Sequence, residues 1–174
     1  MYIHTFNIDE HTLVDEHAYL IYRKVTPVWH AGKCPNGFSP EGRKFLYEDY
    51  SPLLKPGDVF YEIVLLNVEP SHRLEGLGSK LVKQFFDECQ PTSVVLSAGI
   101  TTEELYDRLC NDPNPNALMS YLLDNQVKFW EKQGFTNVNN TTFYAEQSVP
   151  MLWPNNMANT AINRTNNFNC SKET

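Results

Sequence analysis

The apolar run at residues 59–68 constrains the fold of this chain more than any other segment. It reads VFYEIVLLNV, is interrupted only by Glu62 and Asn67, and stands between the turn residues Pro56-Gly57 and Pro70. A run that is so rich in β-branched and aromatic residues indicates a strand. Because both of its faces are apolar, we expect this strand to lie inside a sheet and not at its edge.

An amphipathic helix is expected directly after this strand, at residues 76–90. Apolar side chains fill one half of its helical wheel, Lys80 and Lys83 lie on the other half, and Pro91 ends it. Residues 94–97 then form a short buried strand. The succession of strand, helix and strand predicts an α/β (α+β) fold with a mixed central β-sheet flanked by helices.

Further helices and strands are expected downstream. Helical patterns cover residues 101–109 and 117–132, and Gly134 ends the second helix. Two short strands at residues 135–138 and 142–146, joined by two asparagines, predict a hairpin.

The two ends of the chain carry weaker patterns. Residues 2–8 predict a strand, residues 39–50 predict a short helix, and residues 13–24 are compatible with either. We expect one domain over residues 1–150 and an Asn-rich C-terminal tail, peripheral or disordered, over residues 151–174.

Composition and charge exclude several classes of protein. Among 174 residues, 14 Lys and Arg stand against 21 Asp and Glu, for a formal net charge of −7, whereas nucleic-acid binding requires a basic stripe. No run of about 18 apolar residues could cross a membrane. The chain also lacks the basic start and apolar stretch of a secretory signal. We therefore expect a cytoplasmic monomer or homodimer that binds neither nucleic acid nor membrane.

The cysteines do not form a metal-binding or disulfide pattern. Cys34, Cys89, Cys110 and Cys170 contain no C-x-x-C pair, and no His-x₃-His follows them. A disulfide framework is not expected without an export signal. We therefore expect reduced thiols and no metal.

The loop between the central strand and the following helix carries the clearest chemistry. Residues 68–79 read VEPSHRLEGLGS, so two glycines stand where the helix begins. The unpaired N–H groups and the dipole of a helix N-terminus favour a phosphate. Gly76 and Gly78 allow the backbone to approach a pyrophosphate closely, Arg73 adds a positive charge and Ser79 adds a hydroxyl donor. A lone G-x-G would be only a turn with two incidental glycines.

Two motifs together resemble one family. Arg-x-x-Gly-x-Gly at residues 73–78 resembles the acetyl-CoA pyrophosphate loop of the GCN5-related N-acetyltransferase family. About 50 residues later, Phe129-Trp-Glu-Lys-Gln-Gly-Phe135 resembles the aromatic-aromatic-x-x-x-Gly-Phe segment that closes the fourth helix of that family. The resemblance covers residues 58–146 and implies the acyl-CoA N-acyltransferase fold, with a splayed mixed sheet and acetyl-CoA as acyl donor.

The resemblance also implies where the acyl donor is held. Its pantetheine arm would lie between the strands at residues 59–68 and 94–97, against backbone groups of the first strand. Its pyrophosphate would lie on the loop amides. The residues that we expect to bind it are Leu66, Asn67, Val68, Arg73, Leu74, Glu75, Gly76, Leu77, Gly78, Ser79, Asn125 and Phe129.

Glu62 is a candidate general base. It is the single carboxylate within the apolar strand, and a carboxylate there must be paired, face a wet cleft or be hard to ionise. Such a group could take the proton that an amine must lose before it attacks a thioester. Members of the family that act on histones carry a glutamate at this offset from the loop. An ion pair with a neighbouring strand or helix is the alternative.

The general acid is where the chain departs from the family. Trp130 stands where many members carry the tyrosine that protonates the departing thiolate, and an indole N–H cannot replace it. Either solvent protonates the thiolate, or a different hydroxyl does, for which Tyr121 and Tyr144 are candidates. Leu123 replaces an asparagine that bonds the pantetheine in many members, and Asn125 is a possible substitute.

These features predict an N-acetyltransferase that transfers an acetyl group from acetyl-CoA to a primary amine by direct attack. The acidic Glu75 beside the phosphates and the missing Tyr and Asn leave open a catalytically silent CoA-binding module with the same fold. The net charge of −7 favours small cationic amines or lysine side chains as acceptors, in a small molecule or a peptide. A nucleotide-binding βαβ protein is a weaker alternative, because no Gly-Lys-Ser/Thr follows the loop.

Overall fold

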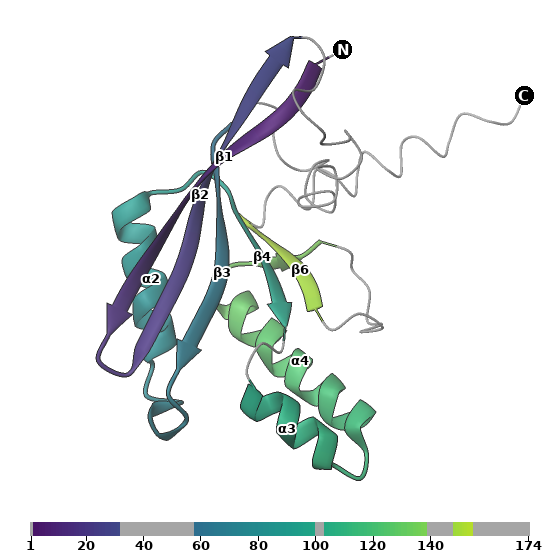
Figure 1. The fold of residues 1–174 in the computed structure, drawn as a ribbon. Helices are drawn as coiled ribbons and strands as arrows, with labels where there is room; N and C mark the ends of the chain where they lie inside the picture. The colour runs from purple at the N-terminus through teal and green to yellow at the C-terminus, as the bar shows by residue number, and fades with distance from the viewer. Residues whose placement is uncertain (1, 32–57, 100–102, 139–147, 155–174) are drawn as a thin grey trace, which may run out of the picture.

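The computed structural model describes residues 2–31, 58–99, 103–138 and 148–154, and contains one six-stranded sheet (Figure 1). The strand order is β1-β2-β3-β4-β6-β5. Only the pair β3 and β4 is parallel, so the sheet is mixed, and the expected fold class is confirmed. The strands are β1 (Tyr2–Asp15), β2 (Ala18–Ala31), β3 (Phe60–Val68), β4 (Val94–Gly99), β5 (Thr136–Asn137) and β6 (Ser148–Trp153).

The first two strands form a long antiparallel hairpin. Their register runs from Tyr2 opposite Ala31 to Asp15 opposite Ala18. The segment 13–24, which the sequence left open between helix and strand, therefore consists of strand on either side of the turn at residues 16–17. Its buried residues are alternate ones, which is the period of a strand and not of a helix. The helix expected at residues 39–50 lies outside the described residues.

The helices lie where the sequence placed them, apart from their end residues. The segments are η1 (Pro70–His72), α2 (Leu77–Cys89), α3 (Glu103–Asn111) and α4 (Pro115–Lys132). The side chain of Asn114 caps α4 by accepting from the N–H of Ala117 at 3.3 Å. After the last turn of α4, Gly134 adopts a φ of 92°, as expected of the residue that ends this helix.

The main core lies between one face of the sheet and the helices α2 and α4. From β4 it contains the alternate residues Val94, Leu96 and Ala98, which share that face, together with Phe85 of α2 and Trp130 of α4. Both helices therefore cover the same face. A second, smaller cluster of Val25, Phe60, Val95 and Leu152 marks the opposite face.

The strands β3 and β4 separate soon after they meet. Only Tyr61, Glu62 and Ile63 of β3 pair with β4. Directly after them the register of β3 against β2 shifts, because Ile63 pairs with Tyr22 and Leu65 with Ile21. Val64 is therefore an extra residue, a β-bulge, which bends and twists the strand. The sheet is splayed at this point, between the two strands that the family resemblance indicated.

The expected hairpin and tail are corrected by β6. Among the described residues β5 pairs with Ser148–Trp153, and the segment 142–146 of the expected hairpin lies outside the described residues. The same strand pairs with β4 and carries Met151 and Leu152, both fully buried. The tail therefore cannot begin at residue 151 as predicted, because the sheet continues through Trp153. Within the described residues, no helix is long and apolar enough to span a membrane.

Replacing Met151 tests whether β6 belongs to the core. Met151→Ala should lower the free energy of unfolding by about 2–5 kcal/mol, because it leaves a cavity at a fully buried site. Val14→Ala is the control, since Val14 is 73% exposed and such surface changes stay within about 0.5 kcal/mol. Denaturant titration measures both, and equal stabilities of the two variants would contradict a central β6.

Candidate active site

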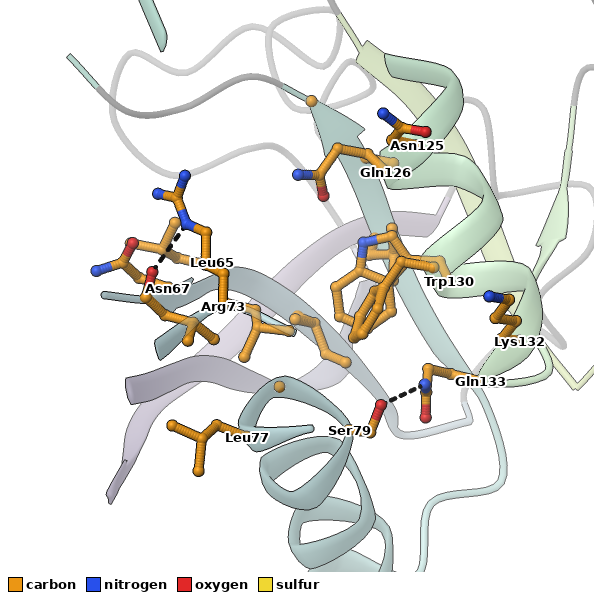
Figure 2. A pocket seen from close by; sticks show the side chains of 18 of the residues that line it. Leu65, Asn67, Arg73, Leu77, Ser79, Asn125, Gln126, Trp130, Lys132 and Gln133 are labelled. Atoms are coloured by element: carbon orange, nitrogen blue, oxygen red, sulfur yellow. Dashed lines mark hydrogen bonds between the residues drawn. The ribbon is translucent and has the colours of Figure 1, made fainter. Parts of the chain in front are cut away.

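A cleft of about 660 Å³ opens where β3 and β4 separate (Figure 2). Residues 63–68 of β3 and residues 96–99 of β4 form two of its walls. The loop before α2 and the first turn of that helix close one end, and α4 supplies the remaining wall. This volume lies within the range of small-molecule and cofactor sites.

The loop presents free backbone donors to the cleft. Gly76 is the N-cap of α2 with a φ of 83°, and no side chain caps the helix. The first intrahelical bond is donated by Lys80, to the carbonyl of Gly76. Among the described residues, the N–H groups of Leu77, Gly78 and Ser79 therefore have no acceptor. Three unpaired donors at the positive end of a helix dipole form an anion site.

Two polar side chains are held in place around these donors. Nε of Arg73 donates to the carbonyl oxygen of Val68 at 3.2 Å, which ties the loop to the end of β3. On the other side, Oγ of Ser79 accepts from Nε2 of Gln133 at 3.0 Å and joins α2 to the end of α4 (Figure 2). The guanidinium and the hydroxyl thus border the same anion site.

The edge of β3 that faces β4 presents unpaired backbone groups. The N–H of Glu69 donates to the carbonyl of His17 at 2.9 Å and so points toward the β1–β2 hairpin. Because these groups alternate sides along a strand, the N–H and C=O of Leu66 and the N–H of Val68 point the other way and are open, whereas the carbonyl of Val68 accepts from Arg73. No residue of β4 pairs with them. An extended arm with amide groups could bond to this edge as an added strand does.

The glycines test whether an acyl-CoA fits these residues. A Cβ added to Gly78 would lie 3.4 Å from both Leu66 and Phe129, so any larger side chain would fill the passage between β3 and α4. At Gly76 nothing lies within 4 Å of an added Cβ, but the positive φ itself favours glycine. Gly78 thus keeps the route from the anion site into the cleft open. The residues therefore fit a phosphate group joined to a narrow arm.

Other charges near the loop are paired among themselves. Oε2 of Glu75 lies 3.1 Å from Nδ1 of His72, and Nζ of Lys80 lies 2.6 Å from Oδ2 of Asp15. The hydrogen bond from Lys80 is the main cause that lowers the pKa of Asp15. Lys80 therefore has its own counter-ion, and Arg73 is the cation that the loop itself contributes to the cleft.

The structure brings most of the expected cofactor residues together. Those that line the cleft are Leu66, Asn67, Val68, Arg73, Leu74, Gly76, Leu77, Gly78, Ser79, Asn125 and Phe129. Glu75 is not among the lining residues, because its side chain turns to His72. The acidic residue of the loop is therefore directed away from the anion site.

Glu62 lies beside the point of separation but on the other face of the sheet. It shares its face with Phe60, opposite the helices, and does not line the cleft. Oε2 of Glu62 is 3.6 Å from Nη1 of Arg23, whose Nε donates to Glu10 at 2.8 Å. The ion pair with a neighbouring strand that the sequence left open is present, and the side chain of Glu62 is 22% exposed.

Tyr121, the candidate acid that the structure describes, lies outside the cleft. Tyr121 is 62% exposed and does not line it, and Tyr144 lies outside the described residues. Trp130 lines the cleft and is almost fully buried. Leu123 is fully buried, whereas Asn125, the possible substitute for the missing asparagine, is among the lining residues.

Sequence reasoning missed several lining residues. These are His72, Arg108, Leu122, Gln126, Lys132 and Gln133. Those on α4 and just after it recur at spacings of three and four together with Phe129, which is the spacing of one helix face. That periodicity was available in the sequence and could have identified Gln126 and Gln133.

One group among the described residues offers metal-type ligand atoms. Atoms of His17, Glu69 and His72 lie within 4.8 Å of one another. The two imidazoles, however, are stacked with ring centroids 3.6 Å apart and an angle of 8° between their planes. Because a ring nitrogen binds a metal in the plane of its ring, lone pairs in two parallel planes do not meet at one ion. We therefore do not assign these side chains as metal ligands.

Comparison with known proteins adds distant structural likenesses. No family model and no curated protein matches the chain. A solved structure described as histone acetyltransferase HPA2 and related acetyltransferase from Corynebacterium glutamicum is 11% identical, with a TM-score of 0.41, over 79% of this chain and 57% of that one. Naa20 of Chaetomium thermophilum, solved with a bisubstrate analogue, is 15% identical, with a TM-score of 0.42, over 89% and 68%.

A third solved structure, described as a bacterial toxin, is 15% identical, with a TM-score of 0.44, over 84% of this chain and 64% of that one. The chain thus spans between 57% and 68% of the length of these three proteins. Likeness at this level assigns no activity, and we therefore derive the function from the cleft and from the two motifs.

Substitution of Gly78 tests the passage into the cleft. Gly78→Val should weaken CoA binding by about 100-fold or more, because its methyl groups would lie between Leu66 and Phe129 and occupy space that a ligand needs. Gly78→Ala is the matched control and should bind within about tenfold of the unchanged protein, since its single methyl makes ordinary contacts. Isothermal titration measures both, and CoA affinity unchanged in Gly78→Val would contradict this path.

Proposed function

We propose that the protein is an acetyl-CoA-dependent N-acetyltransferase that acetylates a primary amine by direct attack on the thioester. The observation that carries this proposal is the continuity of the cleft. Free N–H groups of α2 lie at one end, the unpaired edge of β3 lies along the side, and Glu62 lies near the point where the strands meet. The cleft thus offers complementary groups to an anion and to an amide-bearing arm, and Glu62, on the opposite face of the sheet, is the candidate partner of an amine.

The residues divide the reaction between the two faces of the sheet. The loop and the first turn of α2 would bind the pyrophosphate, and the edge of β3 would orient the arm with its thioester beside Leu66. The N–H of Leu66 donates to the thioester carbonyl and stabilises the charge that develops on its oxygen. The acceptor amine approaches from the face that carries Glu62, opposite the helices.

Glu62 removes the proton from the incoming ammonium, directly or through one water. The amine nitrogen then forms a bond to the acetyl carbon while the carbon–sulfur bond breaks. Trp130 cannot protonate the thiolate, so we assign that proton to solvent. Solvent can protonate a thiolate at neutral pH, because the pKa of a thiol is about 8.5. No cysteine of the described residues lines the cleft, so this route needs no acyl-enzyme.

A catalytically silent CoA-binding module is the alternative, and Trp130 is the observation that favours it. Two other departures from the family pattern are weaker arguments for a silent module once the structure is considered. The carboxylate of Glu75 turns to His72, and Asn125 lines the cleft although Leu123 is buried. Thus the chain retains a polar amide in the cleft and an anion site that the acidic loop residue does not enter.

Thiol release separates the two functions. Purified protein is mixed with acetyl-CoA and a panel of amines that includes polyamines, aminoglycosides and lysine peptides, and free CoA thiol is measured. We expect turnover with at least one class of amine and retention of acetyl-CoA binding throughout. Binding of acetyl-CoA without turnover for any amine would favour the silent module.

The role of Glu62 is tested by Glu62→Gln, which keeps the shape of the side chain but cannot accept the proton. The turnover rate at neutral pH should fall by about 10² to 10⁴, while acetyl-CoA affinity stays nearly unchanged. The loss should shrink as the pH rises, because more of the amine is then already deprotonated. A structural carboxylate would show no such recovery.

Glu10→Gln is the control for the ion pairs around Arg23, because Glu10 is the closer partner of the same guanidinium. It should change the rate by less than about threefold, since an exposed ion pair contributes little. Equal rates of Glu62→Gln and the unchanged protein near pH 7 would exclude Glu62 as the base.

A further inference from the structure

We infer that His72 is a conditional donor to the pyrophosphate, so that cofactor binding takes up a proton and tightens as the pH falls. This inference rests on the proposed function and extends it to the control of the same site. His72 is the last residue of η1, directly before Arg73, and it lines the cleft. Its protonation state therefore bears directly on the anion site.

The tautomer of His72 follows from its partner. Nδ1 lies 3.1 Å from Oε2 of Glu75. An ionised carboxylate only accepts hydrogen bonds, so Nδ1 must carry a proton in this contact. In the neutral ring Nε2 then holds a lone pair, and it makes no hydrogen bond to any residue that the structure describes.

That lone pair decides the response to a phosphate. A phosphate oxygen is itself an acceptor and gains nothing from an unprotonated Nε2. Once the ring takes up a second proton, Nδ1 still donates to Glu75 while Nε2 donates to the phosphate in a charge-assisted bond. The contact therefore exists only in the imidazolium form, so it forms as the pH falls.

His17 holds the ring of His72 in this orientation. The two rings are stacked at 3.6 Å, and His17 is fixed from the turn between β1 and β2 by Nδ1 to Oε2 of Glu69 at 3.0 Å. Its Nε2 lies 3.9 Å from Glu16. A second charge at the stacking distance would repel the first, so a bound phosphate favours placing the proton on His72, which faces the cleft.

Two other charged groups near His72 keep their charge between pH 5.5 and 8. Arg73 stays protonated at every relevant pH. Asp15 stays ionised because the hydrogen bond from Lys80 lowers its pKa from an ordinary value of 3.8. The remaining neighbours, Glu16, Glu69 and Glu75, bear carboxylates, which accept hydrogen bonds when ionised. The variants below therefore separate the two stacked histidines from each other.

Dephospho-CoA is the probe for this proton, because it lacks the 3′-phosphate, whose own second pKa near about 6 would otherwise contribute. Its dissociation constant should be about tenfold lower at pH 5.5 than at pH 8, which corresponds to a difference of about 1.4 kcal/mol in binding free energy. At pH 7 the observed binding enthalpy should also vary with the ionisation enthalpy of the buffer. The slope of this dependence should have the sign that indicates proton uptake on binding.

Three variants identify the linked group. His72→Gln keeps a donor to Glu75 but cannot titrate, so its affinity should change less than about twofold over the same range. His17→Phe keeps the stacked ring and should retain the pH dependence, and so should His11→Gln on β1, which removes a histidine that does not line the cleft. Thermal unfolding at pH 8 checks that all three variants fold.

The outcomes are distinct for the two proposals. Affinity of the unchanged protein that is flat between pH 5.5 and 8, or a pH dependence that persists in His72→Gln, would overturn the role of His72 and leave the acetyltransferase proposal intact. A dependence that disappears in His17→Phe would assign the proton to His17 instead. Failure of both CoA and dephospho-CoA to bind at any pH would reject the cofactor site itself.

Discussion

The early separation of β3 from β4 is the constraint on which the site depends. Two parallel strands that stayed paired would use up each other's backbone groups and leave no space between them. Here pairing stops after Ile63, the bulge at Val64 bends β3, and the N–H and C=O of Leu66 and the N–H of Val68 remain available. The helices α2 and α4 then cover the two diverging halves from the same side, which places the N-terminus of α2 at the open end.

The sequence was sufficient to predict those parts of the structure that depend on interactions between neighbouring residues. The apolar run that became β3, the wheel of α2 and the two glycines of the loop each appear in the structure as expected. They could be predicted because strand length, helical period and a helix start depend on nearby residues. Of the twelve residues that the family resemblance implied as contacts of the acyl donor, eleven line one cleft, whereas Glu75 does not.

Contacts between segments that lie far apart in the sequence could not be predicted in the same way. The pairing of β5 with Ser148–Trp153 depends on which apolar segment fills the gap beside β4, and an Asn-rich flank obscured a strand that carries two fully buried residues, Met151 and Leu152. Likewise, the ion pair of Glu62 with Arg23 and the stack of His17 on His72 join segments 39 and 55 residues apart. Local patterns contain no information on such contacts.

The turn of the first hairpin has a consequence for the order in which the protein folds. Asp15 bonds Lys80 across 65 positions, and His17 bonds Glu69 across 52. Contacts between such distant segments form slowly, because a long loop must close before they contribute. The anion loop thus acquires its final support only when the N-terminal hairpin has docked. Ligand binding during refolding should therefore appear with the last kinetic phase, after most of the helical structure is present.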